Sequence, residues 1–215
     1  MKLSYQDELR KEFDRQVENL IQKRYPKAAD VRAKDFLKHI EPLKGRIRTL
    51  SKRERDAREG RVPFVIVVKN DLVAGEKAMS LVEREKKNGF TVMDADEIKG
   101  FEPIEGVRIP TDAAYLVVDI DTGKETLNIT PDKALKIIER ENRSPLTLDE
   151  GVALITHHPE ILMRNGGFSL PGSRCGDRRV TALWISGGRP KLGWCWAGNP
   201  HTWLGSASCG RRVGV

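Results

Sequence analysis

The residues with the most evident chemistry lie near the C-terminal end of this chain. All three cysteines and all four tryptophans fall within the last 41 of its 215 residues. In the segment GSRCGDRR, the neighbours of Cys175 are charged, namely Arg174, Asp177, Arg178 and Arg179. Nearby cations favour the thiolate, which is the nucleophilic form of cysteine. The sequence therefore predicts a reactive thiol at Cys175.

The same segment has the features of an anion site. Gly172 and Gly176 permit a tight turn, in which exposed N–H groups can join arginines in holding an anion or a developing oxyanion. The alternative is a structural loop whose arginines pair with acidic residues elsewhere. The anion hypothesis assigns ligand contacts to Arg174, Asp177, Arg178, Arg179, Trp196 and Asn199.

A histidine in the same region is placed to assist the thiol. His201 lies in AGNPHTW, between Asn199 and Trp203 and directly after a tryptophan-rich stretch. A histidine beside a reactive cysteine can act as its general base. Cys175 and His201 are therefore the candidate catalytic residues. A histidine packed in a rigid turn is the structural alternative.

Zinc fits the residue types but not their spacing. Cys175, Cys195, His201 and Cys209 are ligands that a tetrahedral zinc site uses. However, no two cysteines are separated by the two to four residues typical of structural zinc sites. We therefore expect no metal site, and the sequence leaves any other cofactor unassigned.

The tryptophans allow two interpretations. Beside arginines they can form a platform on which a base or another aromatic ligand stacks. Tryptophan is also a common filler of a small β core, and this interpretation is the simpler one.

One acidic stretch resembles a known catalytic motif in part. YLVVDIDTG, residues 115–123, is similar to the strand and Asp-x-Asp motif of haloacid-dehalogenase-like phosphotransferases, and Asp119 and Asp121 would share one strand face. That motif requires Gly and then Thr after its second Asp, whereas Thr122 and then Gly123 follow here. A strand that runs into an acidic turn is the simpler interpretation.

Charge is distributed unevenly along the chain. The net charge of +7 divides into +7 for residues 1–61, −6 for residues 62–165 and +6 for residues 166–215. Basic ends can mark a surface for a polyanion such as nucleic acid, or they can attract the acidic middle within one molecule.

Composition indicates a globular chain, with 39% hydrophobic and 32% charged residues. No run approaches the roughly 18 apolar residues of a membrane helix. The opening MKLSYQDELRK contains no apolar segment of the kind that secretory signals require. The odd number of cysteines argues against a disulfide framework. We expect a cytoplasmic protein with reduced thiols and no membrane partner.

Hydrophobic spacing predicts a helical arm over residues 1–61. Apolar residues recur on one helix face over 4–24, and Ser4 with Asp7 resembles a capping box. Further helices are expected over 28–40 and from 43 to about 58. The apolar face over 4–40 also suggests a homodimer. Gly60 and Pro63 mark the end of the arm.

Strands and helices alternate from residue 63 onwards. PFVIVV and AYLVVDI predict buried strands, Phe90 to Met93 a short one, and helices are expected over 75–87 and from Thr130. Thr147 and Glu150 fit a capping box for another helix. In the tail, VTALWI and KLGWCW predict a hairpin across 186–190. We expect an α+β fold with a helical arm and one domain over 62–215. That domain has a mixed α/β middle and a β-rich tail over 166–215.

Two segments resemble an uncharacterised bacterial family, the domain of unknown function fifty-seven-oh-one. They are SPLTLDEGVALITHHPEIL, residues 144–162, and the block rich in Trp, Cys and Gly over 168–210. The similarity runs from about Pro63 to Gly210 and leaves out the first 61 residues. It implies a bacterial cytosolic protein and assigns no catalytic residue.

Two functional hypotheses follow. The first is a small-ligand or catalytic site for an anionic substrate in the tail, which requires Cys175, His201 and an arginine to converge. The second is a non-enzymatic binder of nucleic acid or of the ribosome, which requires a continuous basic surface across the arm and the tail.

Overall fold

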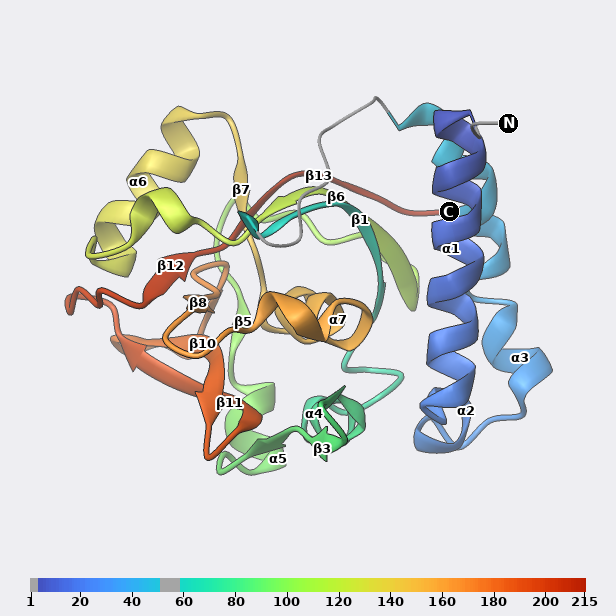
Figure 1. The fold of residues 1–215 in the computed structure, drawn as a ribbon, viewed down its shortest axis with the longest axis horizontal. Coiled ribbons are helices and arrows are strands. Elements are labelled where there is room, and N and C mark those ends of the chain that lie inside the picture. The colour runs from blue at the N-terminus through green and yellow to red at the C-terminus, as the bar shows by residue number, and fades with distance from the viewer. Residues whose placement is uncertain (1–3, 51–58) are drawn as a thin grey trace.

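The N-terminal helix packs along one side of the molecule (Figure 1). A computed structural model describes residues 4–50 and 59–215. Helix α1 (Tyr5–Gln22) begins after Ser4, whose hydroxyl accepts a hydrogen bond from the Asp7 N–H. The predicted helix over 4–24 is therefore confirmed.

The rest of the arm differs from the prediction. Helices α2 (Tyr25–Ala28) and α3 (Ala33–Leu37) and the 3-10 helix η1 (Glu41–Thr49) replace the two long helices expected there. Arg24 and Asp30 adopt left-handed backbone conformations, with φ of 63° and 55°, and so interrupt regular helix. Residues 51–58, which the third expected helix included, lie outside the described residues.

A four-stranded antiparallel sheet has the order β1-β6-β13-β7. Its strands are β1 (Arg61–Val68), β6 (Ala114–Asp121), β7 (Ser144–Pro145) and β13 (Ser208–Val213). The two apolar runs predicted as buried strands are β1 and β6, and they are confirmed. Strand β13 comes from the tail and lies between β6 and β7, which the sequence did not predict.

A second sheet contains the predicted hairpin. Its order is β12-β8-β10-β11-β4. The strands are β4 (Phe90–Thr91), β8 (Gly167–Ser169), β10 (Arg179–Ser186), β11 (Arg189–Trp196) and β12 (Leu204–Ser206). Gly187 and Gly188 connect β10 to β11 with φ of 58° and 73°. Two left-handed residues give the turn that matches strand twist, which is why glycines stand there.

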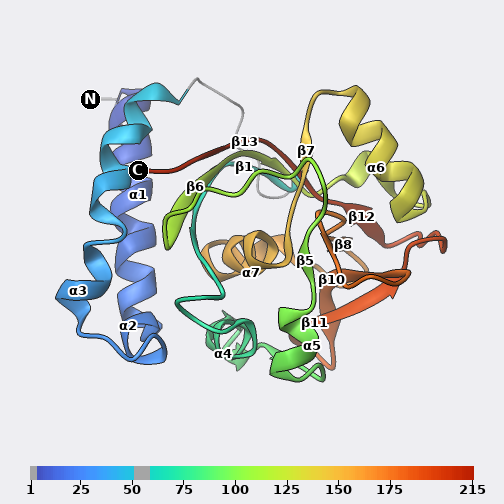
Figure 2. The ribbon, with the colours of Figure 1, turned by 180° about the vertical axis from the view of Figure 1, so that it is seen from behind.

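Helix α7 (Leu148–His157) lies between the two sheets (Figures 1 and 2). Thr147 and Glu150 form the predicted capping box at its start. Nine of its ten residues are buried, and it packs against β1 and β10. A helix that is covered all round is part of the core, so α7 joins the two sheets into one hydrophobic interior.

Short elements complete the chain. They are α4 (Gly75–Leu81), the hairpin β2 (Glu83–Arg84) and β3 (Lys87–Asn88), α5 (Ala95–Lys99), the pair β5 (Glu102–Pro103) and β9 (Ser173–Arg174), η3 (Lys124–Thr126), α6 (Pro131–Arg140) and η4 (Pro159–Ile161). The helix predicted over 75–87 ends early because Glu85 and Lys86, with φ of 52° and 62°, turn the β2–β3 hairpin. The α+β prediction is confirmed.

The arm and the sheets share one core. The Gln16 side chain donates to the Phe64 carbonyl at 3.1 Å and accepts from the Ile66 N–H at 2.8 Å, and all of these groups are buried. The apolar face of α1 is thus covered by its own chain. The domain boundary at residue 61 and the homodimer through residues 4–40 stay predictions. Within residues 4–50 and 59–215, no helix combines the length and the apolar character needed to cross a membrane.

Candidate functional site

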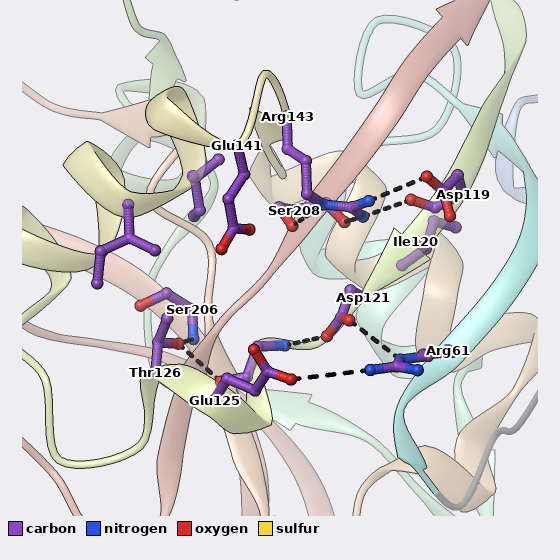
Figure 3. A pocket seen from close by; sticks show the side chains of 13 residues that line it. Arg61, Asp119, Ile120, Asp121, Glu125, Thr126, Glu141, Arg143, Ser206 and Ser208 are labelled. Carbon is purple, nitrogen blue, oxygen red and sulfur yellow. Dashed lines mark hydrogen bonds and ion pairs between the residues drawn. The ribbon is translucent and has the colours of Figure 1, made fainter.

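A polar cavity of about 600 Å³ lies where β6 ends beside α6 and β13 (Figure 3). We refer to it as the polar cavity. Its lining comes from segments far apart in sequence, and its charged members are Arg61, Asp119, Asp121, Glu125, Glu141 and Arg143. Short polar side chains from Thr126, Ser206 and Ser208 add hydroxyl groups.

Asp119 occupies an unusual backbone position in the middle of β6. Its φ of 59° is left-handed, which a residue with a Cβ adopts rarely within a strand. Arg143 holds it there: Nη1 donates to Asp119 Oδ2 at 2.9 Å and Nη2 to the Asp119 carbonyl at 2.6 Å. Gly210 on β13 leaves room, because a Cβ there would lie 2.8 Å from Asp119 Oδ2. Backbone strain of this kind occurs preferentially at functional sites.

Arg143 also ties the floor of the polar cavity to β13. Its Nε donates to the Ser208 hydroxyl at 2.8 Å. The guanidinium thus binds Asp119 and Ser208 together, and each side chain of the Arg143–Asp119 pair is about a fifth exposed, at 19% and 20%. The pair is therefore open to a ligand on one side while its geometry is fixed on the other.

A looser group of charges forms a second part of the wall. Arg61 Nε lies 3.4 Å from Asp121 Oδ2, and its Nη2 lies 3.9 Å from Glu125 Oε1. Asp121 also accepts the Gly123 N–H at 2.7 Å, which closes the turn after β6. These ion-pair distances are longer than that of the Arg143–Asp119 pair, so Arg61 is held less closely by its carboxylates than Arg143.

Glu141 faces these groups from the C-terminal end of α6, next to the apolar Ile137 and Ile138. In Figure 3 its carboxylate points into the polar cavity. Within the part of the chain that the structure describes, no hydrogen bond or ion pair joins the Glu141 carboxylate to another residue, whereas its N–H donates to the Ile137 carbonyl at 3.1 Å. Glu141 is exposed, and it supplies a negative charge that neither arginine neutralises.

The charges lining the polar cavity favour a cation. Four carboxylates face two arginines, and both arginines already contact carboxylates. Among the described residues, no group of three or more His, Cys, Asp or Glu is placed to hold a metal ion. The chemistry of the wall therefore suits an organic cation with groups that can exchange hydrogen bonds with Ser208.

The thiol of Cys175 has a different environment from the one predicted. Cys175 is half-buried, and its Sγ lies 3.2 Å from Asp177 Oδ1, to which it donates. Burial and the hydrogen bond to Asp177 raise the thiol pKa above its ordinary value. The charge of Arg179 acts in the predicted direction, but burial and Asp177 outweigh it, so the net shift of the Cys175 pKa does not favour the thiolate.

Two of the three arginines in the predicted anion site are paired with carboxylates. Arg174 pairs with Asp132 at 3.2 Å. Arg179 pairs with Asp177 at 2.8 Å and with Glu97 at 2.5 Å. This matches the alternative of a structural loop whose arginines pair with acidic residues. Arg178 is exposed, and its guanidinium lies over Gly198.

The predicted site residues divide between the two faces of the β10–β11 hairpin. Arg179 and Trp196 are register partners and share one face. On that face Arg179 lies 5.6 Å from the Trp194 ring, which is 5.0 Å from Trp196. Arg179 also binds Asp177, so that Cys175, Asp177, Arg179 and Trp196 belong to one connected group.

His201 belongs to the other face. Its ring is 5.5 Å from that of Trp203, which packs on the small cluster formed by Val180, Ala182, Cys195, Ala197 and Leu204. Asn199 is exposed, and its N–H closes a turn onto the Trp196 carbonyl. The structure therefore does not bring Cys175 and His201 together, and their catalytic roles stay a prediction.

Sequence reasoning missed most of the polar cavity. It did select Asp119 and Asp121 as a partial motif. Arg143 and Ser208 were missed because they are common residue types and belong to no recognisable sequence motif. Arg143 lies 24 residues from Asp119 and 65 from Ser208. The one local signal was a pair of carboxylates at the end of an apolar strand.

The fold and the polar cavity define an α+β protein with a cavity lined by charged side chains. A family of unknown function, DUF5701, matches residues 19–215, and the chain belongs to this family. The resemblance seen in the sequence is thus confirmed, but its expected start near Pro63 is wrong, because the match begins within α1. No curated protein and no solved structure matches the chain.

Proposed function

We propose that this protein binds a small polar ligand with a positively charged amino or guanidinium group in the polar cavity. The observation that carries the proposal is Asp119, held in a left-handed conformation by Arg143 at the cavity floor. Holding a residue with a Cβ in that conformation costs roughly 1–2 kcal/mol, although Asp tolerates it better than most residues. A fixed carboxylate at the floor and the unpaired Glu141 opposite it can bind a cation between them.

The anion site predicted around Cys175 is the weaker proposal. Asp132 and the pair Asp177 and Glu97 already neutralise Arg174 and Arg179. An anion there would have to compete with these carboxylates, whereas a cation in the polar cavity can bind the Glu141 carboxylate without competing with an arginine for it.

The proposal is tested by calorimetry and thermal shift with the full chain. Putrescine, agmatine and glucosamine are the cationic probes, and butanol, glucose and glucose 6-phosphate are the neutral and anionic ones. We expect the cations to bind and to raise Tm. Preference for the phosphate, or no binding by any cation, contradicts the proposal.

Two variants locate the binding. Glu141→Gln removes the unpaired charge from the polar cavity and is expected to weaken binding of the cation at least fivefold. Glu139→Gln is the matched control, because Glu139 is exposed on the same helix and does not line the cavity. Equal binding by wild type and Glu141→Gln rules out this cavity as the site.

A second candidate function, binding of single-stranded nucleic acid, is favoured by the outer face of the β10–β11 hairpin. Arg189 lies 4.6 Å from the Phe90 ring, and Lys191 lies 5.8 Å from Phe90 and 5.1 Å from Trp184. Trp184 contacts Trp203 at 6.2 Å, which extends the row of rings. Asp177 is the single acidic residue in 166–215. Rings alternating with cations are typical of single-strand binding surfaces.

This candidate uses the tail alone. Helix α1 and strand β11 lie on opposite sides of the molecule in both views (Figures 1 and 2), so this hairpin surface is separate from the arm. Binding of a labelled oligonucleotide at two salt concentrations tests it, with Lys191→Ala expected to weaken binding and Arg164→Ala as the exposed control. Indifference to Lys191→Ala removes the candidate.

We also propose a cytoplasmic, bacterial protein. The three free cysteines and the family resemblance support this location and origin. Fractionation of cells that express a tagged chain tests the location.

A further inference from the structure

A second cavity, of about 360 Å³, lies at the N-terminal end of α7. It is separate from the polar cavity and shares no lining residue with it. Its walls come from the loop after β1, from α5, β5, β6 and β9, and from the start of α7. One side is apolar and consists of Ile98, Phe101, Ile109 and Leu148. A cavity of this size and mixed character is typical of small-ligand sites.

Asp149 supplies a carboxylate to this cavity without a compensating cation. It is half-buried, and its Oδ2 accepts the Asn70 N–H at 3.0 Å. Burial, together with the charges of Glu150 and Asp71, raises its pKa to about 6 although the Asn70 hydrogen bond and Lys69 act in the opposite direction. A cationic group of a ligand beside Asp149 would supply the missing countercharge.

Lys69 supplies an ammonium to the same cavity. Its Nζ donates to the carbonyls of Pro110 at 3.2 Å and Thr111 at 3.3 Å. An ammonium has three donors, so one remains for a ligand. Within the described residues, no ion pair of 4.0 Å or less joins Lys69 to Asp149. The cavity also has Asp71, Lys99 and Glu102 in its lining, and within it Lys69 and Asp149 are a cation and an anion that are not paired with each other.

We infer that this cavity binds a small zwitterion of the α-amino acid class with an apolar side chain. The ligand ammonium binds Asp149, its carboxylate binds Lys69, and its side chain packs on the apolar wall. This inference goes beyond the proposed function, because it concerns another cavity and another ligand.

Calorimetry with the full chain at pH 7 tests the inference with L-phenylalanine and L-leucine as probes. Phenethylamine lacks the carboxylate, and 3-phenylpropionate lacks the ammonium. We expect at least one amino acid to bind and its truncated analogues to bind at least tenfold more weakly. If neither amino acid binds, or if phenethylamine binds as well as phenylalanine, the inference is overturned.

Asp149→Asn is the decisive variant. The amide oxygen can still accept the Asn70 N–H, so we expect the variant to fold, with an unchanged or raised Tm at pH 7. Binding of the amino acid is expected to fall at least tenfold. Asp96→Asn is the matched control, because Asp96 is exposed on α5 and does not line the cavity. Equal binding by wild type and Asp149→Asn overturns the inference.

The pH dependence of amino-acid binding provides a further test of the inference. The charged or titratable groups that act on or with Asp149 are Lys69, Asp71, Glu150, Tyr115 and Tyr25. Because Asp149 has a pKa of about 6 and must be ionised to bind an ammonium, lowering the pH from 7 to 5 is expected to weaken binding roughly tenfold. Asp149→Asn should remove this dependence. Glu141→Gln should leave it intact, which separates this inference from the proposed function.

Discussion

Two arginine–carboxylate pairs each include one residue of the four-stranded sheet, but their surroundings differ in exposure to solvent. Arg212 on β13 binds Glu150 on α7, and the two side chains are 6% and 0% exposed. Arg143 binds Asp119 on β6, and these side chains are 19% and 20% exposed. Chemically the pairs are alike, but one is sealed in the core and the other lines the polar cavity.

The sealed pair is completely satisfied. Arg212 donates to both Glu150 oxygens, at 2.5 and 2.8 Å, and also to Ser144 and to the Pro145 carbonyl. Glu150 additionally accepts from the Tyr115 hydroxyl and the Thr147 N–H. A buried network with every member satisfied fixes a unique packing. The Arg143–Asp119 pair is left open on one side, which is the property that a binding site requires.

The largest expected effect comes from breaking the sealed pair. Arg212→Ala leaves the buried Glu150 carboxylate without its cationic partner, and we expect a loss of about 3–5 kcal/mol in the free energy of unfolding. Urea denaturation measures it. Arg211→Ala is the matched control, because Arg211 is exposed on the same strand. A loss below that of the control would mean that the pair does not stabilise the fold.

Lowering the pH tests whether the buried His157 ring is neutral in the folded protein. His157 is buried; its Nε2 donates to the Ile66 carbonyl at 3.0 Å, and its Nδ1 accepts from Asn19 at 3.2 Å, so the ring is neutral. Burial lowers its pKa from 6.5 to about 3. Below pH 6.5 the unfolded chain takes up the proton first, so stability is complete above that pH and falls as the pH drops toward 3.

We expect the loss of stability between pH 7 and pH 5 to be about 2 kcal/mol smaller in His157→Gln than in wild type. Denaturation of both proteins at the two pH values gives the difference. Asp149 contributes with the opposite sign, because its pKa is raised, but equally in both proteins. Identical pH dependence in the two proteins would show that His157 is not held neutral.

Breaking the Arg143–Asp119 pair should lower the free energy of unfolding less than breaking the Arg212–Glu150 pair. Arg143→Ala leaves Asp119 without its guanidinium, but the carboxylate is already partly solvated, and we expect a loss of roughly 1–2 kcal/mol. The variant should bind the cationic probe more weakly, because Asp119 is no longer fixed. If Arg143→Ala is as damaging as Arg212→Ala, the distinction between the two pairs fails.

Cysteine labelling gives a second measure of how well each of the two pairs is sealed. Cys209 lies near both pairs and is fully buried, and burial raises its thiol pKa to about 12, whereas Cys175 is half-buried. We expect iodoacetamide to label Cys175 before Cys195 and Cys209, because of access and not because of its arginines. Arg212→Ala should accelerate labelling of Cys209 more than Arg143→Ala does. Preferential labelling of Cys195 contradicts this order.

The parts of the fold that the sequence predicted depend on local signals. Thr147 with Glu150 predicted the start of α7, and two apolar runs predicted β1 and β6. The glycines before Arg189 predicted the hairpin. Each signal lies within a few residues of the element it defines, so no knowledge of tertiary contacts was needed. The short helices after α1 were missed because left-handed turns at Arg24 and Asp30 interrupt a continuous apolar pattern.

The candidate site could be predicted less well than the fold. The sequence shows which residues are of a reactive type, but it does not show which of them meet in space. Cysteine, tryptophan and histidine drew attention to the tail, but Trp203 and Cys195 pack in a small core there. The polar cavity depends on Arg143 reaching Asp119 and Ser208 across the sheet, and no pattern within a short window encodes that contact. The carboxylates at Asp119 and Asp121 were visible in the sequence, whereas the left-handed backbone that fixes Asp119 was not.

The amide of Gln16 has a consequence for the β1 edge of the four-stranded sheet. β1 is the outermost strand of its sheet, and such a strand can recruit a strand from another molecule through its free N–H and C=O groups. Gln16 occupies Phe64 and Ile66 on that edge, and His157 adds a bond to the Ile66 carbonyl. Helix α1 therefore blocks strand addition at this edge of the sheet, and proteolytic loss of this one helix would expose the edge to pairing with a strand of another molecule.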